Sequence, residues 1–453
     1  MSEYGVIEAS EVGNWSNETS EADVIIIGLG CAGVCAAIAA SDAGADVLVF
    51  ERASGGGGVT GMAAGHLYLG GGTRVQKAVG VEDAVEDMFT YLMMNTPEPD
   101  EAKIRLYCEE SVAHFDWLVS NGVPFNDTMY KGKHVLQMTD ECLIWSGNEE
   151  VYPFREKAKP APRGHKVAQV GELGGAKMME CLTAKAESLG VRFVYDAHVT
   201  QLVREDGKIC GVNHRIYGED KGCVRARNSV ILAAGQFTQN EDLLKEHLPE
   251  LLDEAYTRQF SPYDDGAGHQ LGKAAGGQLK HMEGALMTAA FYPPESHIKG
   301  ILVNKNGKRY VSEDSYHSRS SMITTEQPDR TGWLIVDEKT YAVEPQHYGA
   351  YPLVDAFETV EEMETALGLP DGSLVETMSN YNKHAALGED PELHKGKKWL
   401  QPLDNAPYAA LNASVGQATY MGFTLGGLDV TIDGEVKTES GGVVPGLYAI
   451  GGC

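Results

Sequence analysis

Several features that define other classes of protein are missing from this sequence. No run of 18 or more apolar residues occurs among its 453 positions, so we expect no membrane-spanning helix. Residues 1–21 are polar and acidic and lack the basic start and apolar centre of a signal peptide, so we interpret them as an arm ahead of the first strand. Basic residues are scarce: 37 Lys and Arg face 65 Asp and Glu. The net charge of −28 argues against nucleic acid or an anionic membrane surface as a partner.

Cysteine is sparse and follows no metal-binding pattern. The eight cysteines stand at positions 31, 35, 108, 142, 181, 210, 223 and 453, without the paired Cys/His spacing of a zinc site. We therefore predict no metal and a reducing, cytoplasmic location. Cys31 and Cys35 lie one helical turn apart, and packing thiols are favoured there over redox chemistry.

Glycine, by contrast, is abundant, with 53 residues, and one early glycine cluster organises the chain. The β-branched run 23–27 ends at the turn Gly28-Leu29-Gly30-Cys31-Ala32-Gly33. We expect a small-residue helix over 34–43, then a second strand over 46–50 that ends in Glu51-Arg52. Strand, glycine turn, helix and strand with a terminal acid are typical of a dinucleotide-binding unit.

Each part of this unit has a physical role in holding a dinucleotide. Gly28 permits the tight turn, Gly30 lets the backbone approach the pyrophosphate, and Gly33 lets helix and strand pack closely. The helix N-terminus offers free N–H groups to the phosphates, and Glu51 can accept the ribose hydroxyls. The alternative is a structural βαβ unit with an empty turn.

A second glycine tract, 53–65, is followed by Leu69-Gly70-Gly71-Gly72-Thr73. Backbone this rich in glycine can lie flat against a large ring such as a flavin. A flexible linker is the alternative, but Met62 and the run 67–69 are too apolar for one. At this tract the sequence resembles the flavoprotein family that includes fumarate reductases and 3-ketosteroid dehydrogenases.

The resemblance extends over residues 22–453. It is carried further by Val230–Gly235, by Asp264–His269 with the glycines that follow, and by Pro445–Cys453. It implies an α/β fold in which a Rossmann-like FAD-binding domain carries an inserted α+β substrate domain. The expected division is an arm at 1–21, an FAD-binding domain at 22–285 and 431–453, and the inserted domain at 286–430.

The periodicity of the sequence predicts further elements. Helices are expected over 82–94, 101–121 and 174–190, and strands over 191–195 and 198–203. Turns are expected at Asp206-Gly207 and at Asn306-Gly307, the second between apolar runs that suggest a β-hairpin. In the loop-rich region 124–175, Arg163 and His165 either face a substrate or belong to a proline-braced structural turn.

The resemblance implies noncovalent FAD, because Val59-Thr60 stands where covalent relatives have a His-Thr pair. The positions that it implies at the cofactor are Gly28, Gly30, Ala32, Gly33, Glu51, Arg52, Gly57, Gly58, Val59, Thr60, Ala63, Ala64, Gly65, Val199, Ala233, Ala234, Gly235, Asp265 and Gly451.

Two branches of the family differ in their substrates. Fumarate reductases clamp a dicarboxylate and have a histidine where this sequence has Phe423, ahead of Thr424-Leu425-Gly426-Gly427. An aromatic hydrocarbon cannot hold a carboxylate. The runs 68–73, 160–165, 300–304 and 313–316 look like those of 3-oxo-5α-steroid 4-dehydrogenases. This branch implies a small apolar substrate, a steroid, with Tyr68, Phe423, Gly426 and Gly427 at the substrate and Tyr316 as a catalytic residue.

The reaction implied is dehydrogenation of a 3-keto-5α-steroid, with the C4 proton passing to a base and hydride passing from C5 to flavin N5. Backbone N–H groups at Gly426-Gly427 or Gly451-Gly452 could polarise the ketone. A tyrosine base needs neighbours that lower its pKa or pass the proton on. Tyr316 as a packing residue is the alternative to a chemical role.

Other functions stay open at this point. They are a reductase of a small unsaturated acid, another 3-ketosteroid dehydrogenase and a noncatalytic flavin-binding protein. An NAD-linked dehydrogenase is disfavoured, because no second dinucleotide fingerprint is present. In the steroid relatives the chain continues past the last strand with a second catalytic Tyr and a Ser. This sequence stops at Cys453, so we expect either a truncated version of a longer chain or a site completed by other residues. As written, the chain is expected to hold FAD weakly or to lack activity.

Overall fold

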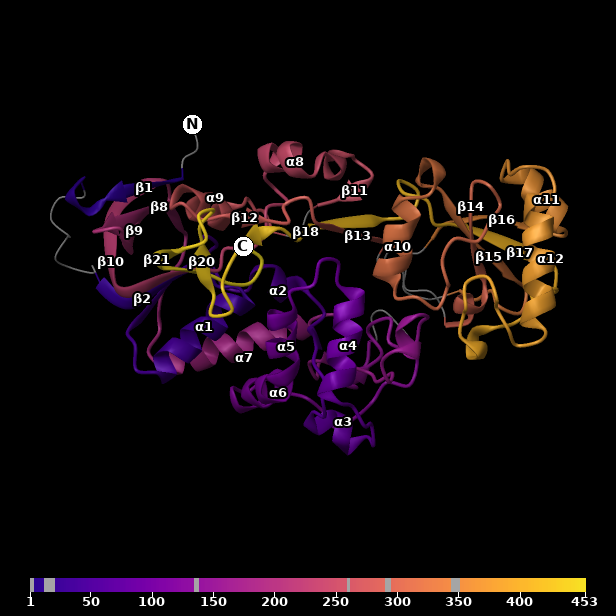
Figure 1. The fold of residues 1–453 in the computed structure, drawn as a ribbon, viewed down its shortest axis with the longest axis horizontal. Coiled ribbons are helices and arrows are strands. Elements are labelled where there is room, and N and C mark those ends of the chain that lie inside the picture. The colour runs from indigo at the N-terminus through magenta and orange to yellow at the C-terminus, as the bar shows by residue number, and fades with distance from the viewer. Residues whose placement is uncertain (1–3, 12–20, 134–137, 259–260, 290–294, 344–350) are drawn as a thin grey trace.

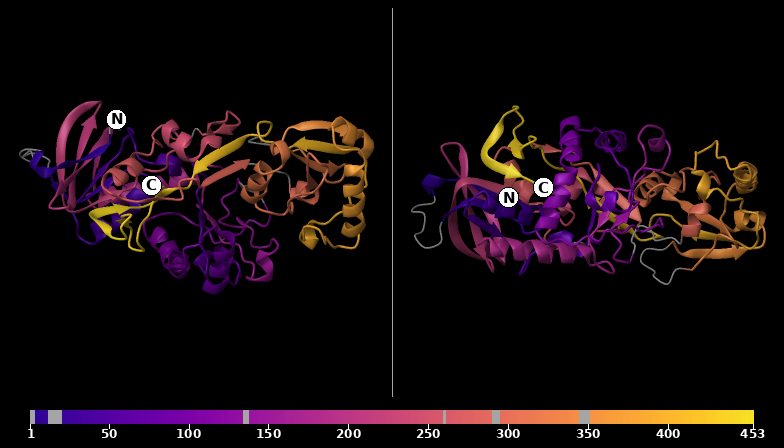
Figure 2. Two further views of the ribbon diagram at one scale, coloured as in Figure 1. Left: turned by 45° about the horizontal axis from the view of Figure 1, so that its top comes forward. Right: turned by 90° about the horizontal axis from the view of Figure 1, so that it is seen from below.

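The computed structural model describes residues 4–11, 21–133, 138–258, 261–289, 295–343 and 351–453. A large sheet lies at one end of an elongated molecule and a four-stranded sheet lies at the other (Figure 1). Two short strands, β13 (Ala285–Ala289) and β18 (Tyr420–Thr424), pair antiparallel between the two ends, as the left view of Figure 2 shows. None of the helices in the described ranges is long and apolar enough to cross a bilayer.

The large sheet has the order β1-β8-β9-β10-β2-β3-β7, with β21 beside β10 and β20 beside β21. Its strands are β1 (Gly5–Glu8), β2 (Glu21–Ile27), β3 (Val47–Phe50), β7 (Arg192–Val194), β8 (Ala197–Glu205), β9 (Lys208–Ile216), β10 (Glu219–Leu232), β20 (Glu435–Lys437) and β21 (Val443–Ala449). β2, β3 and β7 are mutually parallel, and β10 is parallel to β2 and β21. The expected turn Asp206-Gly207 joins β8 to β9, with positive φ at both residues, and is confirmed.

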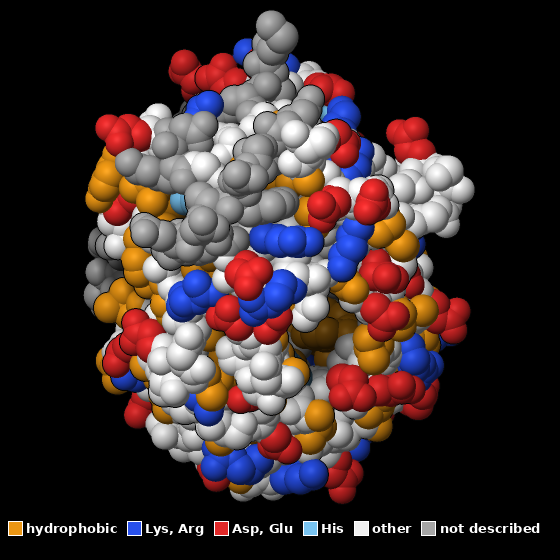
Figure 3. Space-filling model, turned by 90° about the vertical axis from the view of Figure 1, so that its left-hand side faces the viewer, with side chains coloured by type: hydrophobic (Ala, Val, Ile, Leu, Met, Phe, Trp, Pro, Cys, Tyr) orange, Lys and Arg blue, Asp and Glu red, His pale blue; other side chains and the backbone are white. Residues whose placement is uncertain are grey.

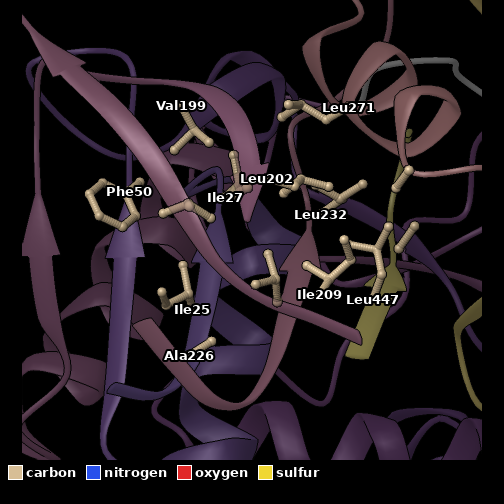
Figure 4. Close-up of a cluster of buried hydrophobic side chains, with 14 of the residues drawn as sticks. Ile25, Ile27, Phe50, Val199, Leu202, Ile209, Ala226, Leu232, Leu271 and Leu447 are labelled. Carbon is tan, nitrogen blue, oxygen red and sulfur yellow. The ribbon is translucent and has the colours of Figure 1, made fainter. Parts of the chain in front are cut away.

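The β-branched residues of β2 are buried on both faces of the sheet. Because side chains alternate along a strand, Ile25 and Ile27 pack on one face, in a cluster with Phe50, Leu232 and Leu447 (Figure 4). The opposite face of β2 packs against α1 (Cys31–Asp42) and α7 (Gly174–Ser188). A strand covered on both faces is typical of an α/β fold, which confirms the fold class.

A helical region with a small sheet lies below the middle of the molecule, between the two ends (Figure 1). It contains α2 (Gly58–Met62), α3 (Arg74–Ala78), α4 (Val85–Asn95), α5 (Glu101–Glu109), α6 (Ser111–Ser120), β4 (His66–Tyr68), β5 (Leu143–Ile144) and β6 (Gly164–Lys166). The single helix expected over 101–121 is wrong, because the chain breaks at Glu110 into α5 and α6. The Ser111 hydroxyl at this break accepts the Gly70 N–H at 2.8 Å, which fixes the start of α6 against the second glycine tract.

The distal end is built on the antiparallel sheet β14-β15-β17-β16. Its elements are β14 (Ile301–Asn304), β15 (Gly332–Asp337), β16 (Leu353–Phe357), β17 (Tyr408–Asn412), α10 (His317–Thr325), α11 (Val360–Ala366) and α12 (Ser373–Ala385). The linking region contains α8 (Glu241–His247), α9 (Ala267–Ala274), β11 (Tyr256–Thr257), β12 (Leu279–Lys280) and β19 (Gly427–Leu428). Short 3₁₀ turns are Ala9–Glu11, Phe154–Glu156, Pro249–Leu252, Glu295–Lys299, Pro328–Arg330 and Lys397–Trp399. The domain boundaries 286 and 430 stay predictions.

The hairpin expected around Asn306-Gly307 is only partly present. The turn forms, with Gly307 at φ 68° and the Asn304 carbonyl accepting its N–H at 2.9 Å. The returning chain makes a single bridge, Val303 with Arg309, and β14 pairs with β15 instead. The Arg309 guanidinium is buried in ion pairs with Glu313 and Asp390, and these contacts hold the chain out of the sheet.

Surface charge at the large-sheet end is mixed in sign. Acidic and basic side chains are interspersed there, and an apolar hollow opens between them (Figure 3). The negative net charge therefore forms no single acidic patch on this face.

Candidate active site

A cavity of about 770 Å³ opens where the carboxyl ends of β2, β3 and β10 meet. This edge of a parallel sheet is where α/β proteins bind dinucleotides. Among the positions assigned to the cofactor, the cavity is lined by Gly28, Gly30, Ala32, Glu51, Arg52, Gly58, Val59, Thr60, Val199, Ala233, Ala234, Gly235, Asp265 and Gly451. The structure thus brings together segments from both ends of the chain.

The three glycines of the first turn differ in their surroundings. A Cβ on Gly28, at φ 107°, would lie 2.3 Å from the Ala233 carbonyl oxygen, and one on Gly33 would lie 2.0 Å from the Gly28 carbonyl oxygen. A Cβ on Gly30 would meet nothing within 4 Å. Gly28 and Gly33 are therefore required by close backbone packing, whereas Gly30 leaves open space at the N-terminus of α1.

The second glycine tract supports the cavity wall from behind at several positions. Gly33, Gly57, Ala63, Ala64 and Gly65 do not line the cavity. The Gly57 N–H donates to the Leu29 carbonyl at 2.8 Å, and the Ala63 carbonyl accepts the Gly175 N–H at 2.9 Å. A Cβ on Gly65 would lie 2.4 Å from backbone of α7. These residues dock the tract on the first turn and on α7, so we retain them as residues that shape the site.

Glu51 is held rigidly at the end of β3. Its two carboxylate oxygens accept the N–H groups of Leu29, at 2.7 Å, and Ala53, at 2.8 Å. The acid is buried, and its position beside the glycine turn suits the ribose contact expected from the sequence.

A polar cluster closes one end of the cavity. Arg52 and Asp265 form a close ion pair, and the Tyr4 hydroxyl donates to Asp265 at 3.1 Å. Burial lowers the pKa of Arg52, but Asp265 and Tyr4 raise it by more, so the pKa is above its usual value. Burial raises the pKa of the neighbouring Asp264 to about 6, although Gln236 donates a hydrogen bond to its carboxylate.

Another part of the cavity wall is apolar. It is lined by Leu67, Leu118, Leu286, Phe423 and Leu425, with His114 beside them. Leu286 and Phe423 are paired across β13 and β18. Sequence analysis found Phe423 but missed the leucines and His114, which carry no motif and are brought together only by the folded chain.

The two glycine pairs proposed to polarise a ketone lie in different places. Gly451 and Gly452 line the cavity. Gly426 and Gly427 do not: the Gly426 carbonyl is bonded to the His269 ring at 3.0 Å, and Gly427 packs against Cys453. The geometry favours Gly451-Gly452 for this role and gives Gly426-Gly427 a packing role.

Tyr316 is not among the residues that line the cavity. Its ring centroid is 4.2 Å from that of His317, whose Nδ1 is 2.7 Å from the Thr288 hydroxyl. Thr288 and the lining residue Leu286 are two positions apart on β13, so they share a face. Burial and the charge of Glu149 raise the pKa of Tyr316 to about 12, so its hydroxyl keeps its proton at neutral pH.

Tyr68 also lies outside the cavity wall. Its ring stacks on Tyr91 with centroids 6.1 Å apart, and burial raises its pKa well above the usual value. Arg163 and His165 are fully buried as well. Arg163 donates from Nε and Nη2 to Asp83, at 3.0 and 2.7 Å, and the His165 ring contacts the Thr73 hydroxyl at 2.8 Å. For this pair the structure favours the braced structural turn over a substrate-facing role.

Known proteins resemble the chain over its whole length. The family model of the FAD binding domain matches residues 23–453. A 3-oxo-5-alpha-steroid 4-dehydrogenase of Comamonas testosteroni is 27% identical over 513 residues, covering 98% of this chain and 94% of that protein. A probable fumarate reductase of Shewanella frigidimarina is 24% identical over 448 residues, covering 96% and 70%.

Among solved structures, the 3-ketosteroid-Δ4-(5α)-dehydrogenase from Rhodococcus jostii RHA1, in complex with 4-androstene-3,17-dione, matches with a TM-score of 0.93. The identity is 41%, and the match covers 99% of this chain and 93% of that chain.

The cavity fits the cofactor that these matches indicate. Open space at Gly30 faces the N-terminus of α1, where a pyrophosphate binds, and Glu51 ends the second strand as a ribose acceptor. The protein is an FAD-dependent oxidoreductase acting on CH–CH groups. The chain belongs to the FAD-binding-domain family of flavoproteins that includes ketosteroid dehydrogenases and fumarate reductases.

Proposed function

We propose that this protein dehydrogenates a 3-keto-5α-steroid between C4 and C5. The observation that carries the proposal is the charge of the cavity wall. Arg52 is the only Lys or Arg among the described residues that line the cavity, and it is paired with Asp265. A dicarboxylate would need unpaired cations, whereas a neutral steroid would need the apolar surface of Leu67, Leu286 and Phe423.

The buried cations near this region are also committed to other groups. Arg163 is paired with Asp83, and the Lys133 ammonium donates to the Asp314 carbonyl. Phe423, in place of a histidine, adds an apolar side chain where a fumarate reductase has a polar one. These features make reduction of a small unsaturated acid the weaker candidate.

In this proposal the protein supplies position and proton transfer. Backbone N–H groups at Gly451-Gly452 donate to the ketone oxygen and stabilise negative charge that develops as C4 loses its proton. Tyr316 accepts that proton at its phenol oxygen, which requires its side chain to reach the substrate, because it does not line the cavity in this structure. FAD, when bound, takes up the hydride from C5. Because Tyr316 is itself protonated at neutral pH, it must release its own proton as it accepts the new one.

The test is an anaerobic titration of the holoenzyme with 5α-androstane-3,17-dione, followed through the visible flavin absorbance. We expect stoichiometric bleaching. Persistence of the band with the steroid, together with reoxidation of dithionite-reduced enzyme by fumarate, would establish the acid reductase instead. If neither compound changes the spectrum, a noncatalytic flavin-binding protein is the remaining reading.

Tyr316→Phe tests the base. The variant should bind FAD with an unchanged visible spectrum, because Tyr316 is not among the positions assigned to the cofactor. Flavin reduction by steroid in a stopped-flow experiment should slow by about 10²-fold or more, the usual contribution of general acid–base catalysis. An unchanged rate would make Tyr316 a packing residue.

A further inference from the structure

A cluster of buried polar side chains without partners lies behind Tyr316. Glu149, in the loop after β5, is 2% exposed, and neither of its carboxylate oxygens has a hydrogen-bond partner among the described residues. The Tyr68 hydroxyl and Nη1 of Arg163 are likewise buried and unpartnered. Buried polar groups are normally satisfied, so this concentration of exceptions points to a function.

The loop that carries Glu149 contacts Tyr316 and Tyr91 directly. Asn148, next to Glu149, accepts the Tyr316 N–H at 2.7 Å through its side-chain oxygen. The Asn148 N–H in turn donates to the Tyr91 hydroxyl at 2.9 Å. This bond occupies an acceptor site of the Tyr91 oxygen and leaves its proton available to another group.

Glu149 and Tyr91 approach each other at Gly147. A Cβ on Gly147 would lie 2.8 Å from the Tyr91 hydroxyl and 2.9 Å from one Glu149 carboxylate oxygen. The absence of a side chain at this position therefore lets both polar groups occupy the same small volume.

Several titratable groups face Glu149 from the surrounding elements. They are Tyr68 on β4, Tyr91 on α4, Lys133, Arg163 before β6 and Tyr316 at the start of α10. The Tyr68 hydroxyl interacts with the carboxyl group but stays outside hydrogen-bonding distance. Neither cation forms an ion pair with Glu149, since Arg163 is paired with Asp83 and Lys133 donates to the Asp314 carbonyl.

This environment gives Glu149 a high affinity for a proton. Burial raises its pKa. The interactions with its own N–H and with the Tyr68 hydroxyl, and the charges of Arg163 and Lys133, oppose this effect only in part. The Glu149 charge in turn raises the pKa of Tyr316, Tyr91 and Tyr68. A buried carboxylate without hydrogen-bond donors has a high free energy while it is charged, and taking up a proton removes that cost. Such a group is suited to accept a proton.

We propose that Glu149 accepts the phenolic proton of Tyr316 during the dehydrogenation, and this inference rests on the proposed function. The C4–H bond of the steroid breaks, and its proton forms a bond to the Tyr316 oxygen while the Tyr316 O–H proton passes to the Glu149 carboxylate. The hydride from C5 reduces FAD, so the steroid loses two hydrogens in total. Glu149 releases its proton to water after the product leaves. It acts through Tyr316 and is a positioning residue.

Glu149→Gln tests the proposal, because the amide has the same shape and cannot accept the proton. We expect steroid affinity, the flavin spectrum and thermal stability to be retained, since the variant buries no charge. Flavin reduction in a single turnover should slow by about 10²-fold or more. The parent rate should rise with pH as Glu149 ionises, and this limb of the pH profile should be absent from the variant.

Two further variants separate a chemical role from a structural one. Glu149→Asp keeps a carboxyl group and should recover part of the rate and restore the pH limb. Glu150→Gln removes the adjacent acid, which pairs with Lys398 at 2.7 Å, and should leave rate and pH profile unchanged.

The outcomes distinguish this inference from the proposed function. If the parent is bleached by steroid and Glu149→Gln is bleached as fast, the relay is wrong and the dehydrogenase stands. If the variant slows but keeps the parent pH limb, Glu149 is structural and the relay is also wrong. If the parent is not bleached at all, both proposals are wrong. Should Glu149→Gln fail to fold, the rate and pH profile of Glu149→Asp decide, since a shifted limb supports the relay and an unmoved one overturns it.

Discussion

Asp264 is a buried acid in the cavity wall, only 5% exposed, next to the paired Asp265. Burial raises its pKa from an ordinary 3.8 to about 6. Between these values the folded protein binds the proton more tightly than the unfolded chain does. The contribution of Asp264 to the free energy of unfolding is therefore fully favourable below about pH 4, falls as the pH rises to about 6, and stays constant above that.

Asp264→Asn should remove this dependence in the FAD-free protein. Relative to the parent, the variant should gain up to about 2 kcal/mol between pH 4 and pH 7, because the amide carries no charge to bury. Urea unfolding at a series of pH values measures the difference. Asp242→Asn is the matched control, since the side chain of Asp242 is 98% exposed. A stability difference that does not change with pH would contradict the assignment.

At the scale of secondary-structure elements, the first βαβ unit allows a specific prediction, because its glycines have different roles. Gly33→Ala places a methyl group 2.0 Å from the Gly28 carbonyl oxygen, so α1 must move away from the turn. We expect a loss of about 1–3 kcal/mol in the free energy of unfolding, the usual cost of overpacking, even without FAD. Thermal unfolding of the apoprotein checks this.

Gly30→Ala is the matched variant in the same turn. Its backbone lies at φ −84°, which any residue adopts, and the added methyl group meets no protein atom within 4 Å. The apoprotein should therefore be as stable as the parent, while affinity for FAD should fall because the methyl group occupies the approach to the pyrophosphate. Equal FAD affinity in the variant and parent would place the pyrophosphate elsewhere.

This unit could be predicted from sequence because its signals are local. Strand, turn and helix follow one another within thirty or so residues, and each step depends on residues that are near in the chain: β-branched residues in β2, glycine at Gly28, small residues in α1. The type of each element is confirmed, although α1 begins at Cys31 rather than at Val34.

The apolar part of the cavity wall could not be predicted in the same way. It depends on β13 pairing with β18, which places Leu286 opposite Phe423 although more than a hundred positions separate them. The cluster around Glu149 also combines β4, α4 and several connecting segments that are far apart in the sequence, and no local pattern marks its unpartnered oxygens. Arg163 shows the same limit, since its motif left a substrate contact and a structural turn equally open until its Asp83 partner, eighty positions away, was located.

At the scale of the molecule, the distribution of charge supports the neutral substrate proposed above. The net charge of −28 gives no long-range attraction to an anion, and the face in Figure 3 shows no basic patch that would reverse this. The cavity wall also lacks an unpaired cation, because Arg52, the one guanidinium among the described lining residues, is paired with Asp265. A neutral substrate is opposed neither by the net charge of the protein nor by the charges of the cavity wall.

The cavity also joins segments from the whole chain, and this makes FAD a global stabiliser. The turn at Gly28, the end of β10 at Ala233 and the segment Gly451-Gly452 all line it. A ligand that binds only when these segments are assembled should raise the free energy of unfolding by about 2.7 kcal/mol at a free concentration one hundred times its Kd. The unfolding temperature should therefore rise continuously with FAD concentration, and Gly30→Ala should need more FAD for the same increase.

Acid precipitation, combined with the unfolding experiment, decides how the flavin is attached. Val59-Thr60 lacks the histidine expected for a covalent link, so acid precipitation should leave the flavin in the supernatant, and protein freed of FAD should regain its visible absorbance when FAD is added. A flavin that precipitates with the protein would contradict noncovalent binding. It would also abolish the dependence of the unfolding temperature on added FAD, because a tethered cofactor does not dissociate as the chain unfolds. The two readouts must therefore change together. If the flavin precipitates with the protein and the unfolding temperature still rises with added FAD, then FAD stabilises the fold from outside this cavity.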